Sequence, residues 1–385
     1  MTSLPAGFAS HTANIGVKDD SLDFVVVLGA AGTRGAAMFT KSRFAGASVV
    51  LSRELVSSGH TRGVVVLSKN SNVATGDEGM RNARELVDTV AARLGCRAEE
   101  LIVASTGVIG RQYPMDRIRH GIAAIPTTPQ GNDAELVARA IMTTDTRPKI
   151  AEAAVRGSSA RVVGVAKGVG MIEPDMATHI SLVFTDAALS RGELETLFRG
   201  TVEHTFNRVS IDTDTSTSDT TVCLASGAAG PVNRTAFADA LHSVLLSLTK
   251  QIARDGEGAE RIIEVRVDRA RDEEQAVTVA RAIVNSPLVK TAVHGADPNW
   301  GRVAMAVGKC TQYTDIQDGS VVIRFGAQEV FPSQVDDAGL ARLSTYMKSE
   351  EVLIHVSLNT GNAEATVWGC DLSAGYVRIN ADYTT

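Results

Sequence analysis

The chain has 385 residues, which is enough for about two domains of ordinary size. Hydrophobic residues make up 44% of it and charged residues 21%, so the composition predicts a large buried core and excludes a disordered chain. The formal net charge is −6, with 38 basic and 44 acidic residues mixed along the sequence. We therefore expect neither a nucleic acid nor an anionic membrane surface as a partner.

Cysteine usage and the N-terminus both indicate a reducing compartment. Cys96, Cys223, Cys310 and Cys370 are far apart and form no CxxC pair, which argues against a zinc site and against a disulfide framework. No basic segment followed by an apolar one opens the chain, so no signal peptide is expected. The apolar stretch 24–31 is too short to span a bilayer. The sequence thus predicts a soluble, cytoplasmic protein without a metal.

Strands and helices alternate in the first half of the chain. Val64–Leu67 and Leu101–Ala104 are predicted strands between turn signals. The apolar residues between them recur at helical spacing, and they are Met80, Ala83, Val87, Val90 and Leu94. Gly95 is the expected C-cap of that helix. Asn132 and Glu135 predict the start of another helix. The expected apolar face of this second helix is Leu136, Ala140 and Ile141.

The second half begins with two predicted strands around a glycine-rich turn. These strands are Arg161–Lys167 and His179–Phe184. Ser190 and Glu193 form a capping box that predicts a helix after the second strand. A longer helix, marked by apolar residues from 237 to 252, is expected to end near Asp255-Gly256.

A strand and helix pattern restarts at Arg261. Ile263, Val265 and Val267 alternate, and a helix is predicted up to Pro287. This restart suggests a smaller α/β subdomain from about residue 261. The chain is expected to end in short strands, among them Val352–Val356 and Tyr376–Ile379. With no repeat and no long linker, the fold class is mixed α/β or α+β.

The run FVVVLGAAGTRG, residues 24–35, resembles a strand that enters a dinucleotide-binding loop. Such a loop needs a following helix to hold the pyrophosphate and an acidic residue about 20 positions further on. Here MFTKSRFAG follows without a helical pattern, and the only acidic residue near that distance, Glu54, lies past the next strand. A plain turn is favoured, and a nucleotide-binding oxidoreductase that uses Gly29–Gly35 stays a remote alternative.

The run RVSIDTDTSTSD, Arg208 to Asp219, resembles the loop of phosphatases with an aspartate nucleophile. That chemistry needs Mg²⁺ held by further carboxylates, and no later motif supplies them. A polar loop near a site is the favoured interpretation.

The run HGADPNWGR contains His294 and Asp297, which are of the types found in catalytic triads and metal sites. One such pair is weak evidence for either. Pro298 is typical of the start of a helix, so a turn that enters a helix is the favoured interpretation.

The segment from Lys167 to Thr178 has the features that a self-cleaving N-terminal-nucleophile precursor needs. A strand ends, glycines follow, Pro174 fixes the chain, and the small Ala177 precedes Thr178. Cleavage between Ala177 and Thr178 would free an α-amine with a reference pKa of about 7.7–8, which can take the hydroxyl proton without a histidine. On spacing alone, a plain turn before a strand fits the same residues.

Motifs along nearly the whole chain resemble those of the ornithine acetyltransferase family, also called glutamate N-acetyltransferase. The cleavage segment KGVGMIEPDMAT is one of them. The others follow in the family's order and are NSNVATG (Asn70–Gly76), ASTGVIG (Ala104–Gly110), AIMTTDT (Ala140–Thr146), DTSTSDTT (Asp214–Thr221), DGEGAE (Asp255–Glu260), SPLVKTAVHGADPNWGR (Ser286–Arg302) and RINADYTT (Arg378–Thr385).

The resemblance implies a role for each matching residue. Thr178 would be the nucleophile, with its α-amine as the base, and Thr106 and Gly107 would form the oxyanion hole. The matching substrate-binding positions are Thr144, Lys167, Thr178, Glu257, Asn380 and Thr385. An acidic and a basic side chain suit amino-acid substrates, which carry both an amine and a carboxylate. Which substrate group meets which residue stays open.

The implied reaction moves an acetyl group from N-acetyl-L-ornithine to L-glutamate through an ester on Thr178, with no cofactor and no metal. An aminopeptidase or amidohydrolase of the same superfamily is the alternative, although those enzymes usually have serine as the nucleophile. Acetyl-CoA as a second donor stays open. Val169 and Thr213 replace residues that are common in the family. These departures leave open a secondary pathway, such as clavulanic acid biosynthesis, in place of arginine biosynthesis.

The resemblance also implies an architecture. The expected fold is a layered αββα-like sandwich of the ornithine acetyltransferase and D-aminopeptidase superfamily, with the smaller C-terminal subdomain. Self-cleavage would give an alpha chain of residues 1–177 and a beta chain of residues 178–385. The expected assembly is an α2β2 heterotetramer of the cleaved chains.

Overall fold

The computed structural model describes residues 2–18, 20–173 and 179–382. One sheet has the strand order β1-β2-β4-β5 and a second has the order β3-β10-β8-β7-β6. The strands of the first are β1 (Phe8–Ala13), β2 (Phe24–Gly29), β4 (Gly63–Leu67) and β5 (Leu101–Ser105). Those of the second are β3 (Arg34–Phe39), β6 (Lys149–Ala154), β7 (Arg161–Lys167), β8 (Ile180–Thr185) and β10 (Thr220–Ala225).

These two sheets face each other and bury apolar side chains between them. Val25, Val64 and Ile102 of the first sheet pack in one cluster with Leu182 and Val222 of the second. The same cluster includes α4 (Ala134–Ile141), which lies beside the sheets. Alternate residues of a strand point to opposite faces of its sheet. Both faces of each of these sheets are apolar, so the outer face of each sheet must also be covered.

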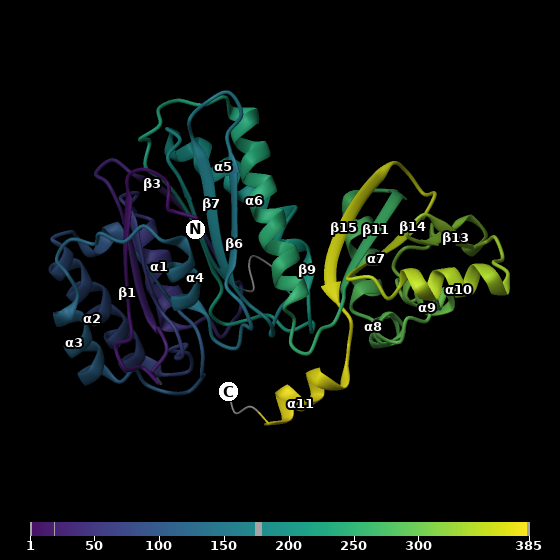
Figure 1. Ribbon diagram of the computed structural model, residues 1–385, viewed down its shortest axis with the longest axis horizontal. Helices are drawn as coiled ribbons and strands as arrows, with labels where there is room; N and C mark the ends of the chain where they lie inside the picture. The colour runs from purple at the N-terminus through teal and green to yellow at the C-terminus, as the bar shows by residue number, and fades with distance from the viewer. Residues whose placement is uncertain (1, 19, 174–178, 383–385) are drawn as a thin grey trace.

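Helices cover both outer faces, so the layers are helix, sheet, sheet and helix (Figure 1). The helices against the first sheet are α1 (Ala47–Val56), α2 (Gly76–Leu94) and α3 (Met115–Ala124). Those against the second are α5 (Arg191–Glu203) and α6 (Arg234–Arg254). The fold is therefore mixed α/β with the expected αββα layering.

A third sheet, in the order β13-β12-β14-β11-β15-β9, forms the smaller lobe of Figure 1. Its strands are β9 (Val209–Ser210), β11 (Ile262–Ala270), β12 (Val322–Phe325), β13 (Gln328–Phe331), β14 (Glu351–Ser357) and β15 (Ala363–Cys370). The helices of this region are α7 (Glu273–Val284), α8 (Pro287–His294), α9 (Trp300–Gly308) and α10 (Asp337–Tyr346). A separate apolar cluster fills it. A subdomain from about residue 261 that folds as a unit of its own stays a prediction.

The remaining elements are short or lie at the chain end. The short 3-10 helices are η1 (Ala98–Glu100), η2 (Phe206–Arg208) and η3 (Asp318–Ser320). The last helix, α11 (Ala374–Asp382), returns from the small lobe and lies below the space between the two lobes in Figure 1. Among the described residues, no helix has the length and apolarity that crossing a membrane requires.

Most predicted elements are confirmed within one or two residues. Gly95 caps α2 in the left-handed conformation, with φ +65°, which a residue without a side chain adopts at little cost. Ser190 and Glu193 form both hydrogen bonds of the capping box that begins α5. The turn around Gly29–Gly35 joins strand β2 to strand β3. A dinucleotide-binding loop would lead into a helix there, so the plain turn is confirmed.

Three predictions about elements are wrong: the N-cap at Asn132, the place of Leu136 on an apolar face, and the strand Tyr376–Ile379. Asp133, and not Asn132, is the N-cap of α4, because its carboxylate accepts the Glu135 N–H. One face of this short helix is covered by the sheets, and Leu136 lies on the other face, 45% exposed. The segment Tyr376–Ile379 is helical and not a strand. Its alternating side chains matched a strand pattern, but Val377 and Ile379 remain exposed, so no sheet buries them.

Candidate functional site

A small polar cavity of about 130 Å³ lies where several loops meet α11. The predicted site residues within the described part of the chain all line it, and they are Thr106, Gly107, Thr144, Lys167, Glu257 and Asn380. They come from segments far apart in the sequence, so the fold alone brings them together. Ala177, Thr178 and Thr385 lie outside the described residues.

Gly107 follows β5 in a conformation that only glycine can adopt here. Its φ is +132°, and an added Cβ would lie 2.2 Å from the carbonyl carbon of Lys69 and 2.5 Å from the Asn70 nitrogen. Hydrogen bonds from Thr106 N–H to Leu67 O (3.1 Å) and from Val108 N–H to Lys69 O (3.3 Å) hold the peptides on either side. No described residue accepts the Gly107 N–H, so this donor can bind an oxyanion in the cavity.

Lys167, the last residue of β7, points its ammonium group at the same place. Its Nζ lies 3.0 Å from Thr106 Oγ1. Burial lowers the pKa of Lys167 below its ordinary value, while the carboxylate of Asp145 opposes that shift. The Thr106 hydroxyl accepts from a cationic donor, which leaves its own proton free for a further acceptor. A hydroxyl, an N–H and an ammonium group thus meet where negative charge would be stabilised.

Glu257 places a carboxylate in the cavity. Asn380 Nδ2 donates to Glu257 Oε2 at 2.9 Å, and the Glu257 N–H donates to Val169 O at 2.8 Å. A Cβ on Gly170 would lie 2.5 Å from Glu257 Oε2, so a glycine there makes room for the carboxylate. Gly258 has φ +71° and lies so close to Tyr376 that a Cβ would come within 2.3 Å of its nitrogen. This close approach lets α11 bring Asn380 to the cavity.

Other cavity residues were missed by the site prediction. Among them are Ser71, Ile109 and Thr143, which carried no signal beyond their place in a matching motif. The stretch Ser216–Ser218 also lines the cavity, where the sequence predicted a polar loop near a site. Behind that loop, Asp219 is 2% exposed, and burial raises the pKa of its carboxyl well above the ordinary value.

Comparison with known proteins gives the family. The ArgJ family model matches residues 9–385. The chain belongs to the ArgJ family. This confirms the resemblance on which the site prediction rested, because the relatives of this family match along the whole chain.

Two curated relatives illustrate the match. Glutamate N-acetyltransferase Oat2 of Streptomyces clavuligerus is 54% identical over 387 residues, which cover 99% of this chain and 98% of the relative. Arginine biosynthesis bifunctional protein ArgJ 2 of Nostoc is 51% identical and covers 100% of this chain and 99% of the relative. A solved structure of arginine biosynthesis bifunctional protein ArgJ from Bacillus halodurans is 38% identical, with a TM-score of 0.48, over 51% of this chain and 96% of that one.

The aspartate-rich loop of this ArgJ family member makes hydrogen bonds to the backbone of the turn after β7. Asp212 accepts the N–H groups of Met171 and Ile172, both at 2.7 Å. Thr213 has φ +70°, a left-handed conformation that favours glycine and that a threonine adopts only at a cost. The loop therefore fixes the turn after β7 that lines the cavity.

His294 pairs with Asp371 and not with Asp297. His294 Nδ1 lies 2.8 Å from Asp371 Oδ2. Asn299, the residue after Pro298, is the N-cap of α9, so the predicted turn that enters a helix is confirmed. Among the described residues, Glu260, His294 and Asp371 bring ligand-type atoms within 4.8 Å of one another. The guanidinium group of Arg261 lies 3.9 Å from Asp371 Oδ2 and supplies positive charge next to these atoms.

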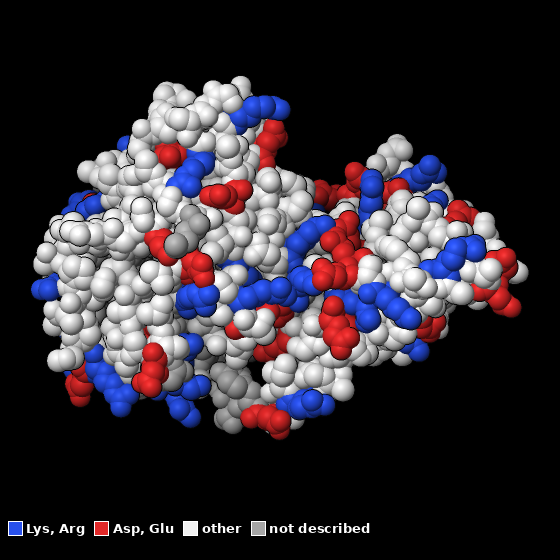
Figure 2. Space-filling model, viewed as in Figure 1, with Lys and Arg blue, Asp and Glu red and all other residues white. Residues whose placement is uncertain are grey.

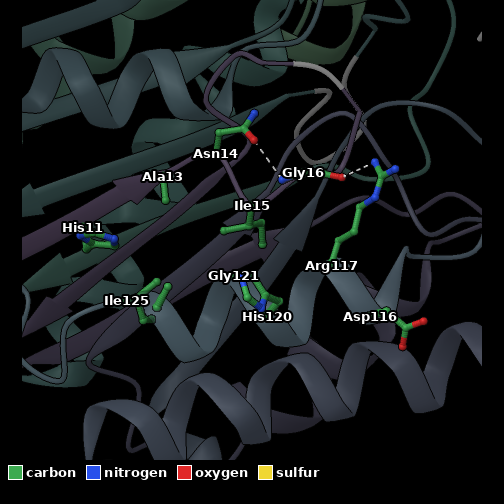
Figure 3. A pocket seen from close by; sticks show the side chains of 11 residues that line it. His11, Ala13, Asn14, Ile15, Gly16, Asp116, Arg117, His120, Gly121 and Ile125 are labelled. Carbon is green, nitrogen blue, oxygen red and sulfur yellow. Dashed lines mark hydrogen bonds between the residues drawn. The ribbon is translucent and has the colours of Figure 1, made fainter.

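A larger hollow of about 570 Å³ lies elsewhere, between the end of β1 and α3 (Figure 3). The Gly16 N–H donates to Asn14 Oδ1 at 3.0 Å, and Arg117 donates to Gly16 O at 3.1 Å. None of the predicted site residues that the structure describes lines it. Basic and acidic side chains are interspersed on the face of the molecule that Figure 2 shows.

His179, the residue after Thr178, is buried and has no polar partner among the described residues. It is 3% exposed, neither ring nitrogen has a hydrogen-bond partner among the described residues, and its ring meets Phe206 edge-on at 4.2 Å. Burial, with smaller contributions from Lys167 and Lys149, lowers the pKa of His179 to about 3. The imidazole is therefore neutral in the folded protein.

We expect His179 to make the fold sensitive to acid. Its folded pKa lies below the ordinary 6.5, so the unfolded chain takes up a proton first. The free energy of unfolding therefore decreases as the pH falls from 6.5 toward about 3. The decrease between pH 7 and pH 5 is about 2 kcal/mol. Urea unfolding should show that His179→Phe removes this loss, while His60→Phe, at an exposed position, keeps it. An equal loss in His179→Phe and wild type would contradict the account.

Proposed function

We propose that this ArgJ family member is a glutamate N-acetyltransferase of the ornithine acetyltransferase kind. It moves acetyl from N-acetyl-L-ornithine to L-glutamate and gives L-ornithine and N-acetyl-L-glutamate. The observation that carries the proposal is the single cavity lined by every predicted site residue that the structure describes. The names of the relatives, a glutamate N-acetyltransferase and arginine biosynthesis proteins, support it.

The proposed mechanism has two steps on one threonine. The Thr178 hydroxyl gives its proton to the Thr178 α-amine and attacks the acetamide carbonyl. The Thr106 hydroxyl and the Gly107 N–H stabilise the tetrahedral oxyanion. The C–N bond breaks, ornithine leaves with the proton, and an acetyl ester remains on Thr178. The amine of glutamate then attacks this ester, and the threonine oxygen leaves and is protonated.

We propose that the same threonine first cleaves its own chain. Attack of the Thr178 hydroxyl on the carbonyl of Ala177 gives an ester, and water hydrolyses it to leave residues 1–177 and residues 178–385. The glycine-rich turn before the cleavage point supports this, because glycines and the small Ala177 leave room for the attack. The two chains are proposed to stay together and to pair into an α2β2 heterotetramer.

Charge placement supports an amino-acid substrate. The cavity has an ammonium group at Lys167 and a carboxylate at Glu257, so it can meet a carboxylate and an amine of one ligand. Thr144 and Asn380 add a hydroxyl and an amide on the cavity wall. Thr385 is proposed to contribute a second hydroxyl. No cofactor takes part in the proposed reaction.

The transferase and the rival hydrolase differ in what removes the acetyl group. Purified enzyme with N-acetylornithine should release ornithine in proportion to added glutamate and form N-acetylglutamate. Double-reciprocal plots of initial rate against N-acetylornithine, at several fixed glutamate concentrations, should give parallel lines. This is expected because the acetyl-enzyme separates the two half-reactions. Release of acetate and ornithine at a rate independent of glutamate would instead establish an amidohydrolase.

The pathway is proposed to be amino-acid biosynthesis in the cytoplasm. The names of the Nostoc relative and of a second relative, both arginine biosynthesis bifunctional proteins, support arginine biosynthesis. The relative of Streptomyces clavuligerus and the departures at Val169 and Thr213 keep a clavulanic acid pathway as the second candidate. Both pathways use the same acetyl transfer.

Asn380 gives a test of the tail. We expect Asn380→Ala to lower kcat/KM for N-acetylornithine and for glutamate, with a rise in the activation free energy of about 0.5–1.5 kcal/mol, because the partly exposed carboxylate of Glu257 loses the 2.9 Å hydrogen bond. Self-cleavage should be normal, since the described side-chain contact of Asn380 is with Glu257 and not with the Thr106–Gly107 peptide. Deleting residues 383–385 should act in the same direction. Wild-type kcat/KM in both variants would show that the tail takes no part.

A further inference from the structure

A buried lysine lies beneath the cavity. Lys149, at the start of β6, has a side chain that is 0% exposed. Its Nζ donates to Asp145 Oδ1 at 2.7 Å and to Asp255 Oδ2 at 2.6 Å, and these carboxylate side chains are 0% and 2% exposed. Burying such ions costs desolvation energy that a pair of hydrophobic residues would avoid, so stability alone is a weak reason for them.

Asp145 links the lysine to two loops of the cavity. The Gly168 N–H donates to Asp145 Oδ1 at 2.7 Å, and the Thr143 N–H donates to Oδ2 at 3.1 Å. Burial raises the pKa of Asp145, but the ammonium groups of Lys149 and Lys167 outweigh it and hold the pKa below the ordinary value. Asp145 is therefore an anion that accepts from both loops at neutral pH.

Asp255 links the lysine to a third loop. The Thr146 N–H donates to Asp255 Oδ2 at 3.1 Å, and the Thr146 hydroxyl donates to Oδ1. Two residues further along the chain, the Glu257 N–H donates to Val169 O at 2.8 Å. One ammonium group thus connects the loops 143–146, 168–170 and 255–257.

These loops carry the cavity side chains that the proposed function needs. Thr144 and Glu257 lie outside helices and strands, and Lys167 is the last residue of β7. The backbones of Thr144 and Glu257 lack the continuous ladder of a sheet interior, and Lys167 lies at the end of its ladder, so other groups must hold these residues in place. We propose that Lys149 is a positioning residue that, through Asp145 and Asp255, sets the distances between Thr144, Lys167 and Glu257. This role rests on the proposed function of the cavity.

The test uses a charge-balanced variant of the full chain. Lys149→Met alone leaves two buried carboxylates facing each other and can prevent folding. Lys149→Met combined with Asp255→Asn removes one charge of each sign and nearly keeps the volume. Arg147→Met is the matched control, because Arg147 also lies near Asp255, at 3.7 Å, but is 53% exposed. Far-UV circular dichroism and thermal unfolding establish that each variant is folded.

We expect the double variant to raise the KM for N-acetylornithine and for glutamate at least about tenfold, since small displacements of positioning groups have large effects. Hydrogen exchange followed by mass spectrometry should become at least about tenfold faster in residues 143–146 and 168–170 and stay at wild-type rates in β8 and β10. Arg147→Met should change neither quantity.

Wild-type KM values in the folded double variant would overturn the proposal. Faster exchange that is equal in the loops and in β8 and β10 would also overturn it, because it would indicate a general loss of stability. If wild-type protein transfers no acetyl group, the proposed function fails instead, and the exchange rates of the loops still decide whether Lys149 holds them.

Discussion

Thr178→Ala is expected to abolish both self-cleavage and acetyl transfer. The variant keeps the turn and the cavity but removes the hydroxyl that attacks in both reactions. Electrophoresis should show one uncleaved chain of 385 residues, and kcat/KM for acetyl transfer should fall by at least about 10⁴-fold, as for other covalent nucleophiles. An uncleaved chain also lacks the free α-amine, so the base is lost together with the nucleophile.

Thr178→Ser is the control for this change. It keeps a hydroxyl at the same position, so we expect it to be cleaved into two chains and to retain measurable transfer activity. Cleavage of Thr178→Ala into the same two chains as wild type would show that another group breaks the bond. Acetyl transfer by Thr178→Ala would remove the residue from the mechanism.

Thr106→Val is expected to lower kcat for acetyl transfer by about 10²–10³-fold, the usual effect of losing one oxyanion donor. Valine has nearly the same shape, so the Gly107 peptide should keep its place between Lys69 and Asn70. The variant also leaves the Lys167 ammonium group without the acceptor that now lies 3.0 Å away. Steady-state kinetics should show the loss mainly in kcat, because the developing charge exists only in the transition state.

Thr61→Val is the matched control for Thr106→Val. Thr61 is also buried, at 2% exposed, and its hydroxyl has no hydrogen-bond partner among the described residues. Replacing that hydroxyl with a methyl group should leave kcat unchanged and the fold at least as stable. A loss of kcat below about threefold in Thr106→Val would exclude the Thr106 hydroxyl from the oxyanion hole.

Sequence patterns predicted the elements that bury one regular face. Ile263, Val265 and Val267 alternate and do form the buried face of β11. The same reasoning failed at Tyr376–Ile379, because four residues fit a strand and a helix equally and only the contact of α11 with Gly258 and Glu257 distinguishes them. Tertiary contacts decided the conformation there.

The cavity was predictable only through motifs. The resemblance supplied Thr106, Lys167, Glu257 and the other matching positions, and the fold brings together those that are described. Lys149 was missed because Asp255, one of its partners, is 106 residues away in the sequence. No periodicity marks a single lysine on a strand as the centre of an ion network. Such links between loops emerge only when the chain is folded.

The central claim is that Thr178 becomes the N-terminus of a second chain and carries the acetyl group. Intact-mass measurement of the purified protein, before and after incubation with N-acetylornithine alone, tests it most directly. We predict two chains, of 177 and 208 residues, with the mass of one acetyl group added to the longer chain and removed again by glutamate. A single chain of 40.5 kDa, or two chains whose masses never change with N-acetylornithine, would contradict the account.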